Sequence, residues 1–290
     1  MYRCDFSFAH IQFQFESEFE IRVGKELLPF LIEGNKKNLV ADCVVKIEFI
    51  LQKELPKVVK VDSWREDKLY TSIEEDSVVF IRNSMTQPPN IMIRYCKKKI
   101  EINYLPEAEN YLKYTHDILN LLGLEKILLD HSAFLLHSSL IRYQENGIIF
   151  SAPCGVGKST QANLWEKYKD SETLNGDRAG IRFVNQKWMA YGMPFAGTSG
   201  IYINDSVPVT AIVILEQNKV NQIRKLTPME AIRKLLPECS CRRWDGEFMN
   251  QLFDLLIGLI QKVPVYLLQC RPDEEAVEFL YKTLVKEEFL

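Results

Sequence analysis

Residues 148–160 read IIFSAPCGVGKST, an apolar run followed by a loop with two glycines and then Lys-Ser-Thr. This order is typical of a phosphate-binding loop between a strand and a helix. Backbone N–H groups that curl around a phosphate leave no room for Cβ atoms at the tightest points, and Gly155 and Gly157 have none. Lys158 adds a positive charge that can reach β- and γ-phosphates, and Ser159 adds a hydroxyl suited to Mg²⁺. The stretch therefore predicts a strand, a phosphate loop and a helix.

The usual pattern of such a loop begins with glycine, and Ala152 stands in that position here, a departure of one methyl group. The surroundings support the interpretation, because a short apolar run precedes the loop and residues 161–165 continue as a helix. The alternative is a glycine-rich turn with an incidental lysine. We expect the nucleotide to be bound by Cys154, Gly155, Val156, Gly157, Lys158, Ser159 and Thr160.

The bulk composition is that of a globular protein. The chain has 290 residues, of which 47% are hydrophobic and 26% charged, so it has room for one large or two moderate domains. We expect two, a β-rich domain at residues 1–104 and a phosphate-loop domain at residues 105–290. Cys154 and the other six cysteines form no C-x-x-C pair and are expected to be free thiols.

Charge and hydropathy exclude several classes of partner. A net charge of −3 and a pI near 5.9 argue against a nucleic-acid-binding surface. We interpret Lys97-Lys98-Lys99 as a solvated strand edge. Residues 1–15 lack the apolar core of an export signal, and charges interrupt residues 118–141, so we expect no membrane segment and a cytoplasmic location.

The first hundred residues predict strands and carry no chemical motif. Apolar residues alternate at 11–15, 45–49, 91–95 and 100–104, which indicates strands with one buried face. Turn residues occur at Glu33-Gly34-Asn35 and Gln87-Pro88-Pro89-Asn90. Substrate recognition, oligomerisation and a purely structural extension remain open as roles for this part.

The remainder predicts a mixed sheet covered by helices. A helical stretch from Tyr111 to Leu128 is expected to share one apolar face and to bridge the two parts. Strands are predicted at 134–143, 147–151, 180–184, 187–191, 207–215 and 263–269, and helices at 229–236, 247–261 and 272–286. Because hairpins interleave with few helices, the fold class is α/β with a mixed (α+β) sheet and not a regular β-α-β alternation.

Two residues outside the loop are candidates for chemistry on a bound nucleotide. Phosphoryl transfer needs a carboxylate that holds Mg²⁺ or takes the proton of the acceptor hydroxyl. Asp177, in Leu174-Asn175-Gly176-Asp177-Arg178, lies where a strand returning beside the loop would end, although Asn-Gly also predicts an ordinary turn aspartate. His137 stands in an apolar strand, where a histidine is more often a satisfied core residue.

Weaker candidates complete the set. Glu216 follows the strand at 207–215, and its alternative role is that of a solvated turn residue. Arg242 and Arg243 could stabilise charge in a transition state or be ordinary surface arginines. Residues 191–200, rich in glycine and hydroxyl groups, suit a mobile loop that faces a substrate or phosphate.

The order of these segments resembles the catalytic domain of HPr kinase/phosphorylase and its divergent relatives, including kinases of lasso-peptide and other peptide-modification clusters. The resemblance covers about residues 130–285. It implies a fold akin to phosphoenolpyruvate carboxykinase. It also implies that His137 is an active-site histidine, that Lys158 and Ser159 are phosphate and Mg²⁺ ligands, and that Asp177 is the second member of an Asp-Asp pair acting as general base and metal-site carboxylate.

The sequence departs from that family at two positions. Gly176 stands where the first aspartate of the pair is usual, and Thr160 where HPr kinase proper has a glutamate. The family's C-terminal signature is also missing. We therefore expect a stand-alone kinase relative that uses ATP and Mg²⁺ to phosphorylate a hydroxyl, with a serine of a protein or peptide as the expected acceptor and Asp177 as the base.

Three alternatives stay open. Loss of the first aspartate could leave a nucleotide-binding module without catalysis, and an ATPase that needs no acceptor would use the same loop. A small molecule could also take the phosphoryl group. The oligomeric state is undetermined by the sequence, with a homo-oligomer as one interpretation.

Overall fold

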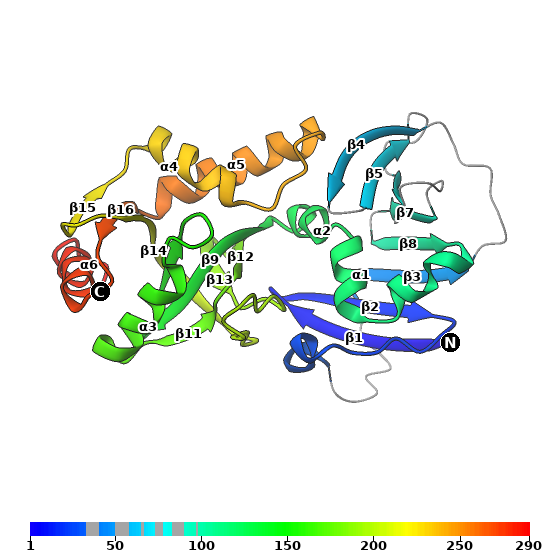
Figure 1. Cartoon of the computed structure of the whole chain (residues 1–290), viewed down its shortest axis with the longest axis horizontal. Coiled ribbons are helices and arrows are strands. Elements are labelled where there is room, and N and C mark those ends of the chain that lie inside the picture. Colours follow the sequence, from blue (N-terminus) through cyan, green and yellow to red (C-terminus); the bar gives the residue numbers. More distant parts are fainter. Residues whose placement is uncertain (33–40, 50–57, 65–66, 73–77, 83–89, 97) are drawn as a thin grey trace. The chain divides into compact units, whose positions relative to one another are not determined.

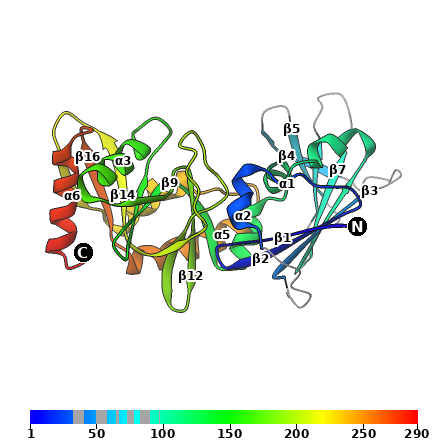
Figure 2. The same cartoon turned by 90° about the horizontal axis from the view of Figure 1, so that it is seen from below.

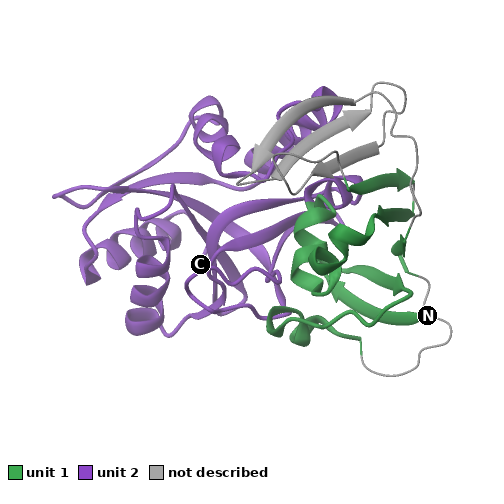
Figure 3. Cartoon of the chain, turned by 45° about the vertical axis from the view of Figure 1, so that its right-hand side comes forward, with its two compact units in different colours: residues 1–124 green, residues 125–290 purple. Residues whose placement is uncertain are grey.

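The computed structural model describes residues 1–32, 41–49, 58–64, 67–72, 78–82, 90–96 and 98–290, and between residues 50 and 89 it describes strand backbones alone (Figures 1 and 2). The chain divides into two compact units, Met1–Leu124 and Glu125–Leu290 (Figure 3). The sequence placed a boundary after Tyr104. Residues 105–124 belong to the first unit because Arg22 N donates to Lys113 O (2.8 Å) and Thr115 N donates to Arg22 O (3.0 Å).

Unit 1 is built on a mixed eight-stranded sheet with the order β1-β2-β3-β8-β7-β6-β5-β4. The strands are β1 (Tyr2–Phe8), β2 (Ile11–Ser17), β3 (Cys43–Phe49), β4 (Val58–Trp64), β5 (Asp67–Ser72), β6 (Val78–Arg82), β7 (Ile91–Cys96) and β8 (Lys99–Tyr104). β3 runs parallel to β2 and β8, and all other neighbours are antiparallel.

The alternation predicted for unit 1 is confirmed along most of its described strands. Phe13 and Phe15 are fully buried, as are most of the other inward positions. Phe49 is an exception, since it is 38% exposed and meets Tyr104 edge to face. The turns expected at Glu33-Gly34-Asn35 and Gln87-Pro88-Pro89, and the first lysine of the cluster at 97–99, lie outside the described residues.

The helical stretch that follows β8 is divided into short helices, whereas the sequence predicted one helical stretch with a shared apolar face. It forms three short helices, the 3-10 helix η2 (Pro106–Leu112) and the α-helices α1 (Thr115–Leu121) and α2 (Leu124–Asp130). A glycine with a positive φ of 61°, Gly123, separates α1 from α2. Tyr111 is 44% exposed and does not share the buried face. The remaining short helix of unit 1 is η1 (Lys25–Phe30).

Unit 2 contains a mixed sheet in which five strands close a ring. The strands of the unit are β9 (Ala133–Tyr143), β10 (Asn146–Ser151), β11 (Glu172–Asn175), β12 (Arg178–Val184), β13 (Lys187–Tyr191), β14 (Ser206–Gln217), β15 (Gln222–Lys225) and β16 (Val265–Cys270). The ring runs β9-β12-β13-β14-β10 and back to β9. β10, β14 and β16 are parallel, and β11 adds to β9. The predicted mixed sheet is therefore confirmed.

Helices cover the sheet of unit 2 in two groups. They are α3 (Lys158–Lys169), α4 (Pro228–Leu235), η3 (Leu236–Glu238), α5 (Gly246–Lys262) and α6 (Glu274–Lys286). α3 and α6 lie side by side, as Figures 1 and 2 show, and an ion pair joins Lys169 to Glu278. Ile148 and Phe150 of β10 pack with α3 and α6, whereas Ile149 packs with α4 and α5. The strand before the loop is thus buried on both faces.

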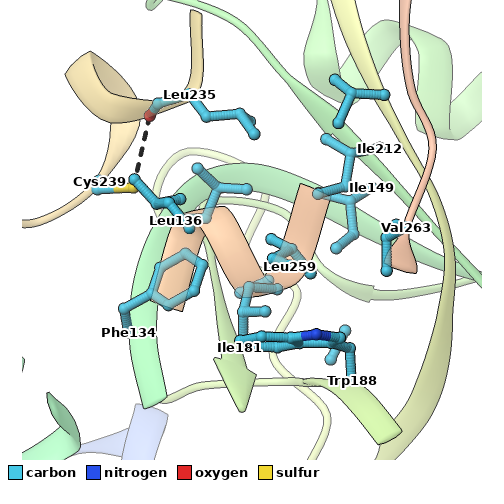
Figure 4. Close-up of a cluster of buried hydrophobic side chains, with 14 of the residues drawn as sticks. Phe134, Leu136, Ile149, Ile181, Trp188, Ile212, Leu235, Cys239, Leu259 and Val263 are labelled. Carbon is cyan, nitrogen blue, oxygen red and sulfur yellow. Dashed lines mark hydrogen bonds between the residues drawn. The ribbon is translucent and has the colours of Figure 1, made fainter. Parts of the chain in front are cut away.

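The core under α4 and α5 also anchors the segment that follows α4. Leu235 and Cys239 pack against Leu136 and Ile149 (Figure 4). Cys239 Sγ donates to Leu235 O at 3.4 Å, and Cys239 forms a β-bridge with Leu136. Ser240 N donates to Leu135 O at 3.0 Å. These contacts hold η3 beside the middle of β9.

The predicted elements of unit 2 lie within a few residues of the observed ones, but β11 and β15 were not predicted, and the last helix begins differently. Pro272 was expected in the first turn of that helix. Asp273 is instead the N-cap, since its carboxylate accepts from Ala276 N at 3.1 Å, and Pro272 lies outside the helix. Among the described helices, none combines the length and the apolar character needed to cross a bilayer.

Candidate functional site

The glycine-rich loop joins the end of β10 to the start of α3. Gly155 has a φ of +80° and Gly157 a φ of +123°, both in the region that side chains disfavour. A Cβ at Gly155 would meet no atom within 4 Å, and one at Gly157 only Thr160 Cβ at 3.9 Å. The glycines are therefore required by the backbone conformation of the loop, and not by crowding within the protein.

Lys158 folds back into the loop at the first position of α3. Its Nζ donates to Ala152 O at 2.8 Å and to Pro153 O at 3.4 Å, and the residue is 8% exposed. Burial lowers the pKa of this ammonium, while the charges of Glu238, Cys154 and Asp177 raise it. The negative charges of Glu238 and Asp177 thus offset part of the effect of burial on the Lys158 pKa.

The first turn of α3 places three polar side chains in different environments. Ser159 is half-buried and Thr160 is exposed. Gln161 is buried, with Nε2 at 3.3 Å from Cys270 Sγ. Its Oε1 has no hydrogen-bond partner among the described residues. From β14, Gln217 Nε2 donates to Val156 O at 3.2 Å and ties the loop to the neighbouring strand.

Asp177 lies in a turn between β11 and β12 that a buried asparagine organises. Asn175 Oδ1 accepts from Asp177 N (3.0 Å) and from Arg178 N (2.8 Å). Asn175 Nδ2 donates to Met193 O (2.8 Å) and to Phe195 O (3.2 Å). One fully buried amide therefore shapes the Asp177 turn and fastens the 193–195 segment to it. We expected residues 191–200 to be a mobile loop, and these bonds tie its first half to the Asp177 turn.

Strand β9 brings His137 between the loop and Asp177. β9 pairs with β10 on one side and with β12 on the other, and His137 is opposite Arg178. Ser151 Oγ, at the end of β10, donates to His137 O at 2.9 Å. His137 Nε2 lies 4.0 Å from Asp177 Oδ1. The sequence-predicted residues His137, Lys158 and Asp177 thus come together beside the middle of β9, where β10 ends and β12 begins.

A second carboxylate reaches the same place from η3. Glu238 Oε2 lies 2.9 Å from His137 Nδ1, and the Glu238 side chain is 11% exposed. We did not predict this residue. It is the single charged residue in the segment Leu235-Leu236-Pro237-Glu238-Cys239, which is the one signal in the sequence that could have drawn attention to it.

The space beside Gly176 is filled by the 193–200 loop. A Cβ at Gly176 would lie 2.5 Å from Ser199 Cβ and closer still to Ser199 Oγ. Ser199 Oγ donates to Ala196 O at 2.7 Å and accepts from Ile201 N at 3.2 Å, so it is held in place. Gly197, with a φ of +54°, approaches Asp177 so closely that a Cβ there would lie 2.8 Å from Asp177 Cβ. In this conformation the Ser199 side chain leaves no room for a side chain at 176.

Two clefts meet at the loop and share Gly155 and Val156. The first, of about 810 Å³, extends past Gln161 towards Cys270 and Arg271. The second, of about 620 Å³, extends past Cys154 towards Arg233, Lys234 and Glu238. The loop is therefore accessible from two directions, one towards β16 and one towards η3.

Two of the weaker candidates, Glu216 and Arg242, pair with other side chains of the protein. Glu216 pairs with Lys234 at 2.6 Å and accepts from Gln269 at 2.9 Å, and the hydrogen bond from Lys234 is the main cause of its lowered pKa. Arg242 is 5% exposed and pairs with Glu125 at 2.7 Å. Cys154 is an exposed free thiol at the loop.

These groups have a definite chemical capacity. A loop with two left-handed glycines at a helix N-terminus suits a bound anion. A buried ammonium and two carboxylates beside it suit charge stabilisation and proton transfer. The Ser159 hydroxyl and the Asp177 carboxylate are oxygen ligands of the kind that Mg²⁺ takes, and Mg²⁺ usually needs one or two protein oxygens in addition to water and substrate phosphates. The residues therefore fit this ion.

Comparison with known proteins identifies one family. The model of the SynChlorMet cassette protein ScmC matches residues 120–274, more than half of the chain. No curated protein matches. Among solved structures, the Hpr(Ser) kinase/phosphatase from Coxiella burnetii is similar at 11% identity, covering 53% of this chain and 98% of that one, with a TM-score of 0.32. A TM-score this low does not establish a common fold, so the HPr kinase resemblance stays a prediction.

Proposed function

The chain belongs to the family of the SynChlorMet cassette protein ScmC, and we propose that it is a phosphotransferase that moves the γ-phosphoryl group of ATP to a hydroxyl. The observation that supports this proposal is the convergence of Lys158, Asp177 and His137 at the glycine-rich loop. A phosphate cradle alone would support binding. A carboxylate that acts on the loop lysine adds a group able to take a proton.

The proposed reaction is an in-line displacement. The acceptor oxygen forms a bond to the γ-phosphorus while the bond between that phosphorus and the β–γ bridging oxygen breaks, and ADP leaves. Asp177 takes the proton of the acceptor hydroxyl. Lys158 turns from the Ala152 carbonyl to the phosphates, where its charge offsets the negative charge of the transition state.

Magnesium would be held by Ser159 and Asp177 together with the phosphates. When bound, the ion would neutralise part of the negative charge of the phosphates. The protein residues orient those oxygens: the loop N–H groups bind them, and the half-buried Ser159 stands at the first turn of α3.

The two clefts suggest the direction of the nucleotide. Asp177 faces His137, which contacts Glu238, and Glu238 lines the cleft towards η3. We place the acceptor in that cleft. The nucleoside then occupies the cleft towards Cys270. A serine of a protein or peptide is our preferred acceptor.

Two substitutions test the proposal. Lys158→Ala removes the charge inside the loop and is expected to abolish ATP binding measured by calorimetry. Lys167→Ala, which changes an exposed lysine on the same helix, is expected to bind ATP normally.

Asp177→Asn is expected to keep ATP binding and to lower transfer of label from γ-labelled ATP by about 10²–10⁴-fold. Asp170→Asn, at an exposed left-handed position that asparagine tolerates, is the matched control.

The outcomes separate the proposed functions. Full transfer activity in Asp177→Asn excludes the role of this residue as base. Tight ATP binding with no label moving to any serine-containing protein or peptide from neighbouring genes favours a nucleotide-binding module, an alternative supported by the filled space at Gly176. Release of labelled phosphate without an acceptor favours an ATPase.

A further inference from the structure

The residue that contacts His137 from η3 has no role in the proposed transfer as described above. Glu238 and His137 are far apart in the chain, yet Glu238 Oε2 and His137 Nδ1 are 2.9 Å apart. The Glu238 side chain is 11% exposed, against 30% for His137. The contacts of Cys239 and Ser240 with β9 fix the backbone that carries this largely buried carboxylate.

The chemistry of this pair determines where the imidazole proton lies. An ionised carboxylate only accepts hydrogen bonds, so the hydrogen between the two groups belongs to His137 Nδ1. In the neutral ring the other nitrogen, Nε2, then carries a lone pair. Nε2 lies 4.0 Å from Asp177 Oδ1, beyond hydrogen-bond distance, so no hydrogen bond from Nε2 to that oxygen opposes this assignment.

We propose that Glu238 is a positioning residue that holds His137 with its proton on Nδ1, so that the Nε2 lone pair faces Asp177. In the transfer reaction, which this part of the inference takes from the proposed function, Asp177 receives the proton of the acceptor hydroxyl. His137 Nε2 then carries no hydrogen and places no donor on the Asp177 oxygen that faces it, the group that is to take this proton.

Two cations near the pair, Lys158 and Arg178, are compatible with this arrangement. Lys158 Nζ is held by the Ala152 and Pro153 carbonyls, and Arg178 Nε lies 3.7 Å from the other oxygen of Asp177, Oδ2. In the described part of the chain, neither forms a hydrogen bond or an ion pair with the His137 ring. Asp177 is left with Oδ1 on the side of His137. Glu238, His137 and Asp177 therefore form a carboxylate–histidine–carboxylate series, carried by η3, by β9 and by the turn between β11 and β12.

The tautomer of His137 can be measured without any substrate. Long-range ¹H–¹⁵N correlation spectra of the full ¹⁵N-labelled chain distinguish Nδ1–H from Nε2–H rings at about pH 8.5, well above the usual histidine pKa of about 6.5. His137→Gln assigns the signals by their loss. His131 is an internal reference, since its Nδ1 donates to Ile127 O at 2.9 Å and is independent of Glu238.

In the unmodified chain His137 is expected as the Nδ1–H form. Glu238→Leu is expected to move it towards the Nε2–H form, which free imidazole prefers, while Glu238→Gln keeps an accepting oxygen and is expected to retain Nδ1–H. Glu247→Gln, an exposed carboxylate on α5, controls for the loss of one charge and is expected to change neither ring. His131 is expected to stay unchanged throughout, which reports that the fold is kept.

An Nε2–H ring at His137 in the unmodified chain overturns the proposal, whether or not any variant folds. An unchanged Nδ1–H ring in Glu238→Leu with His131 intact overturns it as well. The transfer assay then provides a separate measure, in which Glu238→Leu is expected to lose at least tenfold in turnover with little change in ATP affinity. If no transfer is found for the unmodified chain, the proposed function is wrong. The spectra still test separately whether Glu238 sets the tautomer of His137.

Discussion

At the scale of single residues, the site depends on two glycines, Gly176 and Gly197. Because they have no side chain, Ser199 can lie against the first and Asp177 against the second. Gly197 has a φ of +54° and lies directly against the Asp177 side chain, and Gly176 faces Ser199. Neither function is visible in the sequence, where both glycines read as ordinary turn residues. In the structure they fix where the Asp177 carboxylate is and whether a second side chain can stand beside it.

Gly197→Ala is expected to disturb Asp177 more than it disturbs the fold. The new Cβ would lie 2.8 Å from Asp177 Cβ, so the carboxylate or the loop must shift. Gly200→Ala is the matched control. Gly200 has a φ of +69° and open space around its Cβ position, so alanine there introduces backbone strain without a steric contact. We expect a larger loss of turnover in Gly197→Ala than in Gly200→Ala, with similar ATP affinities by calorimetry. Equal turnover in the two variants would contradict the contact with Asp177.

Gly176→Asp, which restores the aspartate pair suggested by the family resemblance, is expected to destabilise unit 2. Its Cβ would overlap Ser199, and such overpacking costs about 1–3 kcal/mol. Removing the obstructing side chain in Gly176→Asp/Ser199→Gly is expected to recover part of that loss. The free energies of unfolding from urea titrations of the single and double variants check this. Additive effects would show that Ser199 is not the obstacle.

At the scale of elements, the position of Glu238 depends on the helix before it. α4 begins with a capping box, in which Thr227 Oγ1 accepts from Glu230 N (3.4 Å) and Glu230 Oε2 accepts from Thr227 N (3.0 Å). α4 runs directly into η3, which presents Glu238 to β9. A local sequence signal, Thr-Pro-Met-Glu, thus defines the start of the element whose end completes the site.

The charge of Glu230 is expected to stabilise the chain in a pH-dependent way. Hydrogen bonds from Arg224, and then from Thr227, lower the pKa of Glu230 from 4.5 to about 2. Since the folded pKa lies below the unfolded one, the contribution is complete above pH 4.5 and is lost as the pH falls towards about 2. Comparison with Glu230→Gln, which can still form the capping box, isolates the charge.

Urea titrations of both proteins at about pH 6, 4 and 3 measure this contribution. The difference in free energy of unfolding is expected to be largest at pH 6 and to shrink steadily towards pH 3. A difference that does not change with pH would show that the Glu230 charge is not stabilising.

At the scale of the whole molecule, each compact unit has its own apolar core. Unit 1 buries aromatic residues of β1 and β2, among which Phe8 and Phe13 stack at 4.4 Å. Unit 2 buries two clusters, one under α3 and α6 and one under α4 and α5. A unit with a separate core can unfold separately.

Phe13→Ala is expected to destabilise unit 1 by about 3–5 kcal/mol, the usual cost of removing a fully buried phenylalanine ring. An unfolding transition at lower urea is expected to appear, while the higher transition and the ATP affinity, which belong to unit 2, stay unchanged. Circular dichroism follows the transitions and calorimetry the affinity. A loss of ATP binding at urea concentrations that unfold only unit 1 would show that the two cores are coupled.

Local patterns alone predicted much of this protein. The order of strand, glycine-rich loop and helix at 148–160, the strands β9, β10, β12, β13 and β14, and the helices α4, α5 and α6 follow from periodicity, capping and glycine placement within short windows. Those signals act between near neighbours in the chain, so they can be read without the fold. Lys158 and Asp177 were also named from their positions in or relative to the loop, whereas the active-site role of His137 came from the family resemblance.

Long-range packing decided the rest. β9 pairs with both β10 and β12, and this pairing alone brings His137 between the loop and Asp177. Glu238 joins His137 because η3 is bridged to β9, and Ser199 occupies the space at Gly176 because Asn175 fastens the following loop. Each of these contacts joins residues whose sequence neighbours carry no sign of the partner. They exist only once the ring of strands has closed, since burial and pairing across the sheet, and not local preference, set those distances.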